Sequence, residues 1–345
     1  EPGARAADLA PLFARLRLEL AELLAAVATA ARGDAAAGDP GAVLTGDFAV
    51  AAQEQLSREV LAAMGFDLSA GRLDVSAHPF TSAASRGDVR LTTRYDPRDL
   101  RVGLYATIHE AGHGLYEQGL PAELEGTPVC DCASLGIHES QSRLWENLIG
   151  RSREFWTCWA PRARRLFPAA LARADAEDLH RAVNVVRPSL IRIEADEITY
   201  NLHIVLRFEL ERALLAGDIQ VAQLPALWNA GMRQSLGVTP ARDAEGVLQD
   251  IHWASGLFGY FPTYALGNLY AAQFHAQAST ELPDLPDLVA RGHTGPLLDW
   301  LRRKIHARAR LSSAAELCRD VTGRGLDTEP FLSHLRRKFG QLYGL

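Results

Sequence analysis

The chain has 345 residues, of which 48% are hydrophobic and 23% are charged, and its formal net charge is −6. This composition is typical of a globular protein with a large core, and the net charge does not indicate a nucleic-acid-binding protein. No stretch reaches the roughly 20 apolar residues of a membrane span, no secretory signal is found at the start, and the four cysteines are too few for a disulfide scaffold. We therefore expect a cytoplasmic protein with neither a membrane nor a nucleic-acid partner.

Two helices and one strand are predicted in the first hundred residues. Residues 8–32 form a long amphipathic pattern that ends at Gly33, and residues 53–64 form a second helix that ends at Gly65. Residues 89–95 alternate between apolar or aromatic and polar side chains, which is the period of a strand. It is the only strand that the sequence predicts, and it directly precedes the next helix.

That next helix, predicted for the apolar and proline-free residues 104–118, carries His109-Glu110-Ala111-Gly112-His113. A spacing of four residues places both imidazoles on one helix face, as two ligands of one tetrahedral metal ion require. Glu110 lies beside this row, where it can accept a proton from a water molecule at the ion. The alternative is an amphipathic helix that carries two histidines and an acid by chance.

A second acid follows at the start of another predicted helix, within His138-Glu139-Ser140-Gln141. Glu139 is the acid best placed to be a third ligand, although His138 competes for that role. Glu139 alternatively stabilises its helix as an acid in the first turn. Cys130-Asp131-Cys132 offers a soft-metal site, but a single cysteine pair without a partner pair is weak support.

The rest of the chain reads as helix after helix, separated by glycine and proline. Helices are predicted at residues 140–159, 171–184, 195–216, 223–235, 285–291, 297–308, 313–321 and 330–343. Residues 259–264 read as an aromatic loop. The fold class is therefore mainly α with a small sheet beside the site. The histidines without ligand-like neighbours are expected in the core or on the surface, namely His180, His203, His275, His293, His306 and His334.

Six motifs stand in a characteristic order along the chain: His78-Pro79-Phe80, Asp88-Val89-Arg90-Leu91-Thr92, His109 to His113, His138-Glu139-Ser140, Ile191 to Asp196, and Gly246 to Trp253. With them the chain resembles the M32 family of metallocarboxypeptidases, the carboxypeptidase Taq type, from about Leu12 to the C-terminus. The resemblance implies an elongated helical gluzincin fold, similar to neurolysin and angiotensin-converting enzyme, with a deep groove. It also implies a single catalytic domain over residues 1–345, peptide substrates and a homodimer.

The resemblance further implies roles for individual residues. His109, His113 and Glu139 would hold one divalent ion per chain, zinc or alternatively cobalt, and Glu110 would be the general base. His252 and a tyrosine, Tyr264 or as second choice Tyr260, would donate hydrogen bonds to the oxyanion. The alternative for either tyrosine is simple packing. Four residues would orient the site without binding the ion or the substrate themselves, namely His138, Asp196, Gln249 and Asp250.

An exopeptidase also binds a terminal carboxylate, which a planar guanidinium recognises with two parallel hydrogen bonds. Arg192 is the first candidate, and Arg90 is the second, with His78 shaping the closed end of the groove. Arg192 alternatively forms an internal ion pair with Glu194 or Asp196, and Arg90 a cross-strand or surface pair.

The chain departs from the family in length, because members are considerably longer and the missing part lies before Leu12. That part would supply helices of one groove wall. We expect a naturally short member, a proteolysed product or a chain whose first residues are not included, and the start at Glu1 favours the last two. The preferred function is a metal-dependent carboxypeptidase of broad specificity. The alternatives are an endo-acting oligopeptidase of the same fold and a peptide-binding protein with a residual metal site.

Overall fold

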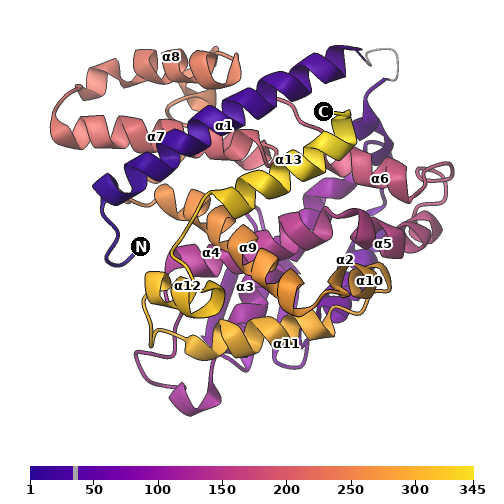
Figure 1. Ribbon diagram of the computed structural model, residues 1–345. Coiled ribbons are helices and arrows are strands. Elements are labelled where there is room, and N and C mark those ends of the chain that lie inside the picture. Colours follow the sequence, from indigo (N-terminus) through magenta and orange to yellow (C-terminus); the bar gives the residue numbers. More distant parts are fainter. Residues whose placement is uncertain (34–37) are drawn as a thin grey trace. The chain divides into compact units, whose positions relative to one another are not determined.

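The computed structural model describes residues 1–33 and 38–345, which are mainly helical with one small sheet (Figure 1). The chain divides into two compact units, each built from separate segments. Unit 1 contains residues 1–2, 38–184 and 267–326, and unit 2 contains residues 3–33, 185–266 and 327–345. The predicted fold class is confirmed, whereas the assignment of residues 1–345 to a single catalytic domain stays a prediction.

The sheet of unit 1 has three described strands, β1 (Gly71–Val75), β2 (Thr81–Ser85) and β3 (Asp88–Thr93), in the order β1-β3-β2. The central strand β3 pairs in parallel with β1 and antiparallel with β2. The prediction of a single strand was therefore wrong. Only β3 carries the alternating apolar pattern, whereas the small residues of β2 become a strand through pairing with β3.

Helix α3 (Leu100–Gly119) follows the sheet and begins where the Asp99 side chain accepts a hydrogen bond from the Arg101 amide at 2.9 Å. It packs on α2 (Val50–Met64), on β3 and on α4 (Leu135–Arg143). The contact with α4 requires Gly112, because a Cβ at this position would lie 2.5 Å from the Ser142 Cα. This close approach brings α4 against the predicted metal-binding helix.

The predicted continuous helix at residues 140–159 was wrong in its middle. Helix α4 runs directly into a π-helical turn, η4 (Leu144–Gly150), and α5 (Arg153–Leu166) begins separately. The break occurs because Ser152 caps α5 by accepting a hydrogen bond from the Phe155 amide at 3.1 Å. Such π turns are frequent at functional sites, and this one carries Glu146.

Helix α9 (Pro262–Glu281) was not predicted, although it has 20 residues. Its first turn belongs to unit 2 and the rest to unit 1. Every residue from Ala265 to Phe274 is buried, so this part of the helix has no polar face and its sequence shows no amphipathic period. The tyrosine that we assigned to a loop, Tyr264, therefore lies at the start of a helix.

The other described elements of unit 1 surround this core. They are η2 (Pro40–Leu44), η3 (Ala122–Leu124), α6 (Ala176–Val183), α10 (Leu285–Ala290), α11 (Gly295–Lys304), η8 (His306–Arg308) and α12 (Ala314–Thr322). Helix α5 packs against α6 and α10. Each α-helix in this set falls in or near a range for which a helix was predicted.

Unit 2 is a helical assembly of α1 (Ala6–Gly33), α7 (Thr199–Ala216), α8 (Leu224–Leu236) and α13 (Glu329–Tyr343), with the short turns η5 (Arg192–Glu194), η6 (Val221–Gln223) and η7 (Asp243–Glu245). Helices α7 and α8 pack as neighbours, and α1 lies against both α7 and α13 (Figure 1). The rings of Phe13 and Phe208 meet edge to face with centroids 4.8 Å apart. Ion pairs join Arg15 of α1 to Glu329 of α13, and Arg336 of α13 to Glu19 of α1.

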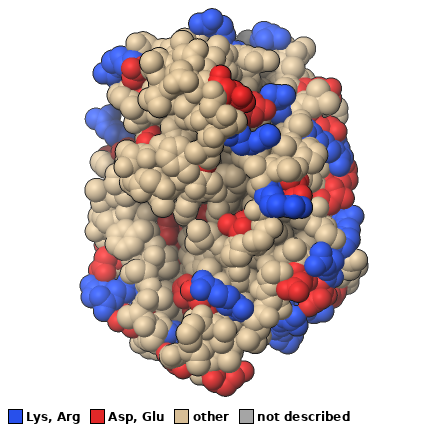
Figure 2. Space-filling model, turned by 90° about the vertical axis from the view of Figure 1, so that its left-hand side faces the viewer, with Lys and Arg blue, Asp and Glu red and all other residues tan. Residues whose placement is uncertain are grey.

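Among the described residues, basic and acidic side chains are interspersed on the face shown in Figure 2, so neither sign forms a continuous area there. Within residues 1–33 and 38–345, no helix combines the length and the apolar character that crossing a membrane requires.

Candidate metal centre

Three of the predicted residues come together in unit 1 as a set of potential metal ligands. The donor atoms of His109, His113 and Glu139 all lie within 4.8 Å of one another. The Glu139 Oε2 atom is 3.8 Å from His109 Nε2 and 3.4 Å from His113 Nε2. Ligands about 2.0–2.1 Å from a tetrahedral zinc ion are separated from one another by roughly 3.3 Å. The spacing and the donor set therefore fit one divalent ion.

The other nitrogen of each imidazole has a protein partner. His109 Nδ1 lies 2.8 Å from Glu146 Oε2, and His113 Nδ1 lies 2.5 Å from His138 Nδ1. His138 Nε2 in turn lies 2.8 Å from Glu117 Oε1. Such partners fix the orientation of a metal-binding histidine. Both ring nitrogens of His138 are engaged in this way, and Glu139 is the third member of the set of potential ligands.

The Glu139 carboxylate is also oriented by its neighbours. Its Oε1 atom accepts a hydrogen bond of 2.7 Å from Arg143 Nε, which leaves Oε2 facing the two imidazoles. Helix α9 approaches this side chain closely, because a Cβ at Gly267 would lie 2.4 Å from the Glu139 Cγ. A larger residue at position 267 would displace Glu139.

Burial and neighbouring charges set the protonation of these groups. Burial opposes ionisation of Glu139, but Arg143 and then His109 outweigh it and hold the pKa of Glu139 well below its usual value. Burial, together with the adjacent His138, lowers the pKa of His113 to about 3. Burial acts in the same direction on His109, but the carboxylates of Glu139 and Glu146 reverse it and raise the His109 pKa. Neutral His113 and ionised Glu139 are the forms that bind a metal ion.

Glu110, the predicted general base, is buried on α3 directly after His109. Burial raises the pKa of its carboxyl group, against the opposing effects of His109 and of a hydrogen bond from Thr81. The Thr81 Oγ1 atom donates this bond to Glu110 Oε2 at 2.7 Å. A raised pKa suits a group that accepts and later releases a proton near neutral pH.

A second cluster of predicted residues lies in unit 2. Arg192 is buried and donates to Asp250 Oδ1 through Nε at 3.1 Å and Nη2 at 2.8 Å, and to the Tyr200 hydroxyl at 3.0 Å. Asp250 also binds Arg207 Nε at 2.7 Å. The Gln249 Oε1 atom accepts from the Arg192 amide at 2.9 Å. The internal partner of Arg192 is thus Asp250, not one of the two acids that we considered.

The proposed oxyanion donors belong to the same cluster. His252 Nε2 lies 3.0 Å from the Tyr264 hydroxyl, and the Tyr260 ring lies 5.3 Å from the His252 ring between centroids. The guanidinium of Arg192 stacks over the Tyr264 ring at 4.7 Å. Burial lowers the pKa of His252, with the nearby Asp250 opposing it. Ion pairing and stacking therefore hold the tyrosine and the histidine in one arrangement.

Three further predicted residues lie outside both clusters. Asp196 precedes α7 and accepts hydrogen bonds from the amides of Ile198 and Thr199 at 2.9 and 3.0 Å. Arg90 is exposed on β3 and forms a surface ion pair with Asp88 at 2.7 Å. His78 is exposed in the connection before β2.

Sequence reasoning missed several residues that contact the predicted site side chains, namely Glu117, Arg143, Glu146 and Thr81. Helical spacing offered a signal for Arg143, which follows Glu139 by four residues, whereas the partner of Glu117 is His138 on another helix. Glu146 depends on the π turn and Thr81 on strand pairing, which no local pattern indicated.

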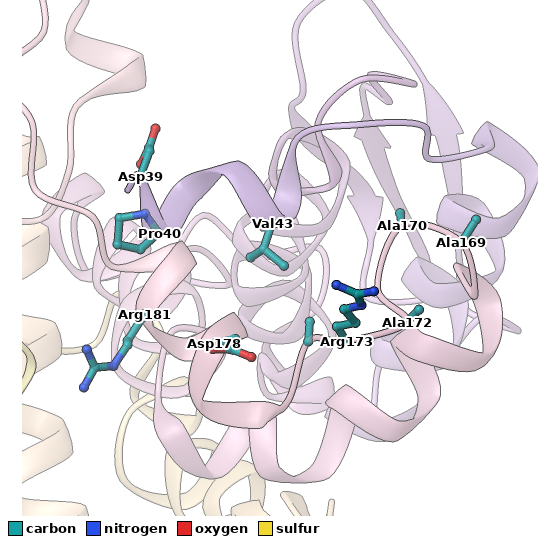
Figure 3. Close-up of a pocket in the computed structure, with 10 residues that line it drawn as sticks. Asp39, Pro40, Val43, Ala169, Ala170, Ala172, Arg173, Asp178 and Arg181 are labelled. Carbon is teal, nitrogen blue, oxygen red and sulfur yellow. The ribbon is translucent and has the colours of Figure 1, made fainter. Parts of the chain in front are cut away.

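Two other features of unit 1 do not belong to this centre. The pocket in Figure 3 has a volume of about 430 Å³, is lined by η2, the connection before α6 and α6 itself, and contains none of the predicted site residues. Asp131 pairs with Arg310 at 2.6 Å, and within the described residues neither Cys130 nor Cys132 joins a group of three potential metal ligands. The soft-metal alternative therefore gains no support.

Comparison with known proteins agrees with these motifs. The family model described as carboxypeptidase Taq (M32) metallopeptidase matches residues 1–339. The chain is 51% identical to thermostable carboxypeptidase 1 of Thermus thermophilus, over 100% of this chain and 66% of that protein. It is 42% identical to carboxypeptidase 1 of Bacillus subtilis, over 99% of this chain and 68% of that protein.

Among solved structures, an M32 carboxypeptidase from Deinococcus radiodurans superposes with a TM-score of 0.96 at 43% identity, over 100% of this chain and 68% of that chain. The chain thus spans about two thirds of the length of these relatives.

Proposed function

Because the chain belongs to the carboxypeptidase Taq (M32) metallopeptidase family, we propose that it releases single residues from the C-termini of peptides in a metal-dependent reaction. The observation that carries this proposal is the convergence of His109, His113 and Glu139, with both Nε2 atoms directed at one carboxylate oxygen. The family relationship and the names of the relatives support the choice of reaction.

We propose that these three side chains bind one divalent ion, zinc or alternatively cobalt, because two imidazoles and a carboxylate suit either metal. Such an ion supplies Lewis-acid chemistry, since it polarises a peptide carbonyl and lowers the pKa of a water molecule from 15.7 to about 7. The outer partners Glu146 and His138 keep both Nε2 atoms directed at the ligand position.

The chain's own chemistry in this proposal is proton transfer by Glu110. Its carboxylate accepts the proton of the attacking water and then delivers that proton to the leaving amine nitrogen. The burial that raises its pKa favours acceptance of the proton, and the amine nitrogen is basic enough to take that proton in the second step. The carboxylate ends the cycle ionised, as it began.

The unit 2 cluster is proposed to act on the substrate. His252 and Tyr264, or alternatively Tyr260, would stabilise the oxyanion by hydrogen bonding. Arg192 has five N–H groups, and the three bonds to Asp250 and Tyr200 use three of them, so within the described residues two remain for a terminal carboxylate. Gln249 and Asp250 would hold Arg192 in place, and Arg90 with His78 remain the second candidates for carboxylate recognition.

The test uses a peptide with a free C-terminus and the same peptide amidated, each incubated with the zinc-loaded protein and followed by mass spectrometry. A carboxypeptidase shortens the free-acid peptide one residue at a time, spares the amide and loses activity with a chelator. Internal cleavage of the amidated peptide would instead indicate an oligopeptidase. Glu110→Gln should abolish cleavage while metal binding persists, and Glu123→Gln, an exposed acid of η3, is the matched control.

If the wild-type protein binds peptides but cleaves neither, the peptide-binding alternative replaces the enzyme. We further propose that the protein acts in the cytoplasm as a homodimer, on the basis of composition and family resemblance. Light scattering of the purified protein and fractionation of the source cells test these two points.

A further inference from the structure

The connection that leads into strand β2 is fixed to β3 by Thr92. The Phe80 amide donates to Thr92 Oγ1 at 2.9 Å, and the Thr92 amide donates to the Phe80 carbonyl at 2.9 Å. The Ser76 hydroxyl also donates to Thr92 Oγ1 at 2.7 Å. Thr81, the first residue of β2, is paired with Leu91 of β3. Two of the six sequence motifs therefore fix the position of Thr81.

From this position the Thr81 side chain reaches the predicted general base. Its Oγ1 atom lies 2.7 Å from Glu110 Oε2 and 3.0 Å from the Glu110 carbonyl oxygen. The hydroxyl has one proton, and the shorter contact is with the carboxylate. In the part of the chain that the structure describes, no other hydrogen bond reaches this carboxylate. Since Glu110 is 6% exposed, water has little access to replace that bond.

The hydrogen bond from Thr81 occupies Oε2 of Glu110, so Oε1 is the carboxylate oxygen that can accept a proton. Proton transfer requires the acceptor oxygen to lie within hydrogen-bond reach of the donor, and a misplacement of about 1 Å can lower a rate by about 100-fold. A carboxylate at the end of a flexible glutamate side chain needs such a support, because burial alone does not select one rotamer.

We propose that Thr81 is a positioning residue that holds the Glu110 carboxylate in its proton-accepting orientation, with Thr92 fixing the strand that presents it. This inference rests on the proposed carboxypeptidase function. The motifs at residues 78–80 and 88–92 then act on the site through Phe80, Thr81 and Thr92. The residues first predicted to act from these motifs, His78 and Arg90, are exposed.

The test compares Thr81→Val, which removes the hydroxyl at nearly constant shape, with Thr81→Ser, which keeps it. Both are assayed in the zinc-loaded protein on a dansylated tripeptide with a free C-terminus. We expect Thr81→Val to lower kcat about 10- to 100-fold with KM within about twofold, and Thr81→Ser to stay within about threefold of wild type. Ser82→Ala, on the opposite and exposed face of β2, is the matched control and should match wild type.

Two further measurements separate positioning from a structural effect. Zinc content per chain should be unchanged in Thr81→Val, and Thr81→Val should slow the residual cleavage by Glu110→Gln less than about twofold, because the two residues act as one unit. If Thr81→Val does not fold, Thr81→Ala carries the same test. The inference is overturned if the valine variant keeps wild-type kcat, or if the serine variant loses as much as the valine variant. A wild-type protein without cleavage refutes the proposed function instead.

Discussion

Glu146 and Glu117 support the two histidines of the proposed metal centre at different distances, and substituting each of them tests how the centre is held. Glu146 contacts His109 Nδ1 directly at 2.8 Å, whereas Glu117 reaches His113 only through His138. We expect Glu146→Gln to weaken zinc binding more than Glu117→Gln, because the first change alters the partner of a ligand and the second alters a partner one residue further away.

The size of the first effect follows from the bond that is lost. A glutamine amide still accepts the Nδ1 proton of His109, so the orientation of the ring is kept and only the charge disappears. A hydrogen bond to a charged group is worth about 1.5–3 kcal/mol and one between neutral groups about 1 kcal/mol. The difference of about 0.5–2 kcal/mol has a midpoint that corresponds to roughly tenfold weaker zinc binding for Glu146→Gln. For Glu117→Gln, which acts only through His138, we expect a smaller loss of affinity.

Competition with a chromophoric chelator measures both affinities on the metal-free proteins, and Glu123→Gln serves as the control. Thermal unfolding of the metal-free variants verifies that each one folds. Zinc affinities of both variants within twofold of wild type, or a larger loss for Glu117→Gln than for Glu146→Gln, would refute this account of how the histidines are held.

Three other outcomes are expected. Gly112→Ala should destabilise the protein by about 1–3 kcal/mol in denaturant unfolding, because its Cβ would meet the Ser142 backbone, whereas Gly295→Ala, which meets nothing within 4 Å, should not. Burial opposes ionisation of Glu197, but Lys338 outweighs it and lowers the Glu197 pKa from 4.5 to about 2. The ion pair therefore stabilises the fold fully above pH 4.5, the pKa of the unfolded state, and this stabilisation is lost as the pH falls toward 2. Its size is on the order of 3 kcal/mol, and Glu197→Gln should show a correspondingly flatter fall of unfolding free energy between pH 5 and 3; an unchanged slope would contradict the assignment. Removal of the metal by a chelator should reversibly lower the midpoint temperature of thermal unfolding. A metal ion at 1,000 times its Kd adds about 4 kcal/mol to the free energy of unfolding. Calorimetry that shows no shift of the midpoint would exclude a bound ion.

The sequence allowed the helical class and the family to be predicted, because helical periodicity and short motifs are local patterns. Two histidines four residues apart share a helix face whatever surrounds them. The family model over residues 1–339 confirms the resemblance that the six motifs indicated. The roles of the individual site residues stay predictions that the experiments above address.

What escaped prediction depends on contacts between distant segments. Strand β2 exists through its pairing with β3, and α9 lacks a polar face from Ala265 to Phe274 because neighbours cover that part on all sides. The partner of Arg192 was sought among nearby acids, but Asp250 is 58 residues away in sequence. Local periodicity contains no information about such pairs.

The pairing of α1 with α13 in unit 2 has a consequence for synthesis of the chain. These helices are separated by nearly 300 residues, yet the ion pairs of Arg15 with Glu329 and of Arg336 with Glu19 connect them. During translation α7 can cover part of the apolar stripe of α1, but the part that contacts α13 stays exposed until α13 has left the ribosome. Closing so long a loop is entropically costly and slow, so unit 2 should be the last part to acquire protease resistance. On a ribosome stalled before Glu329, the α13-facing apolar side chains of α1 would therefore still be exposed and accessible to chaperones.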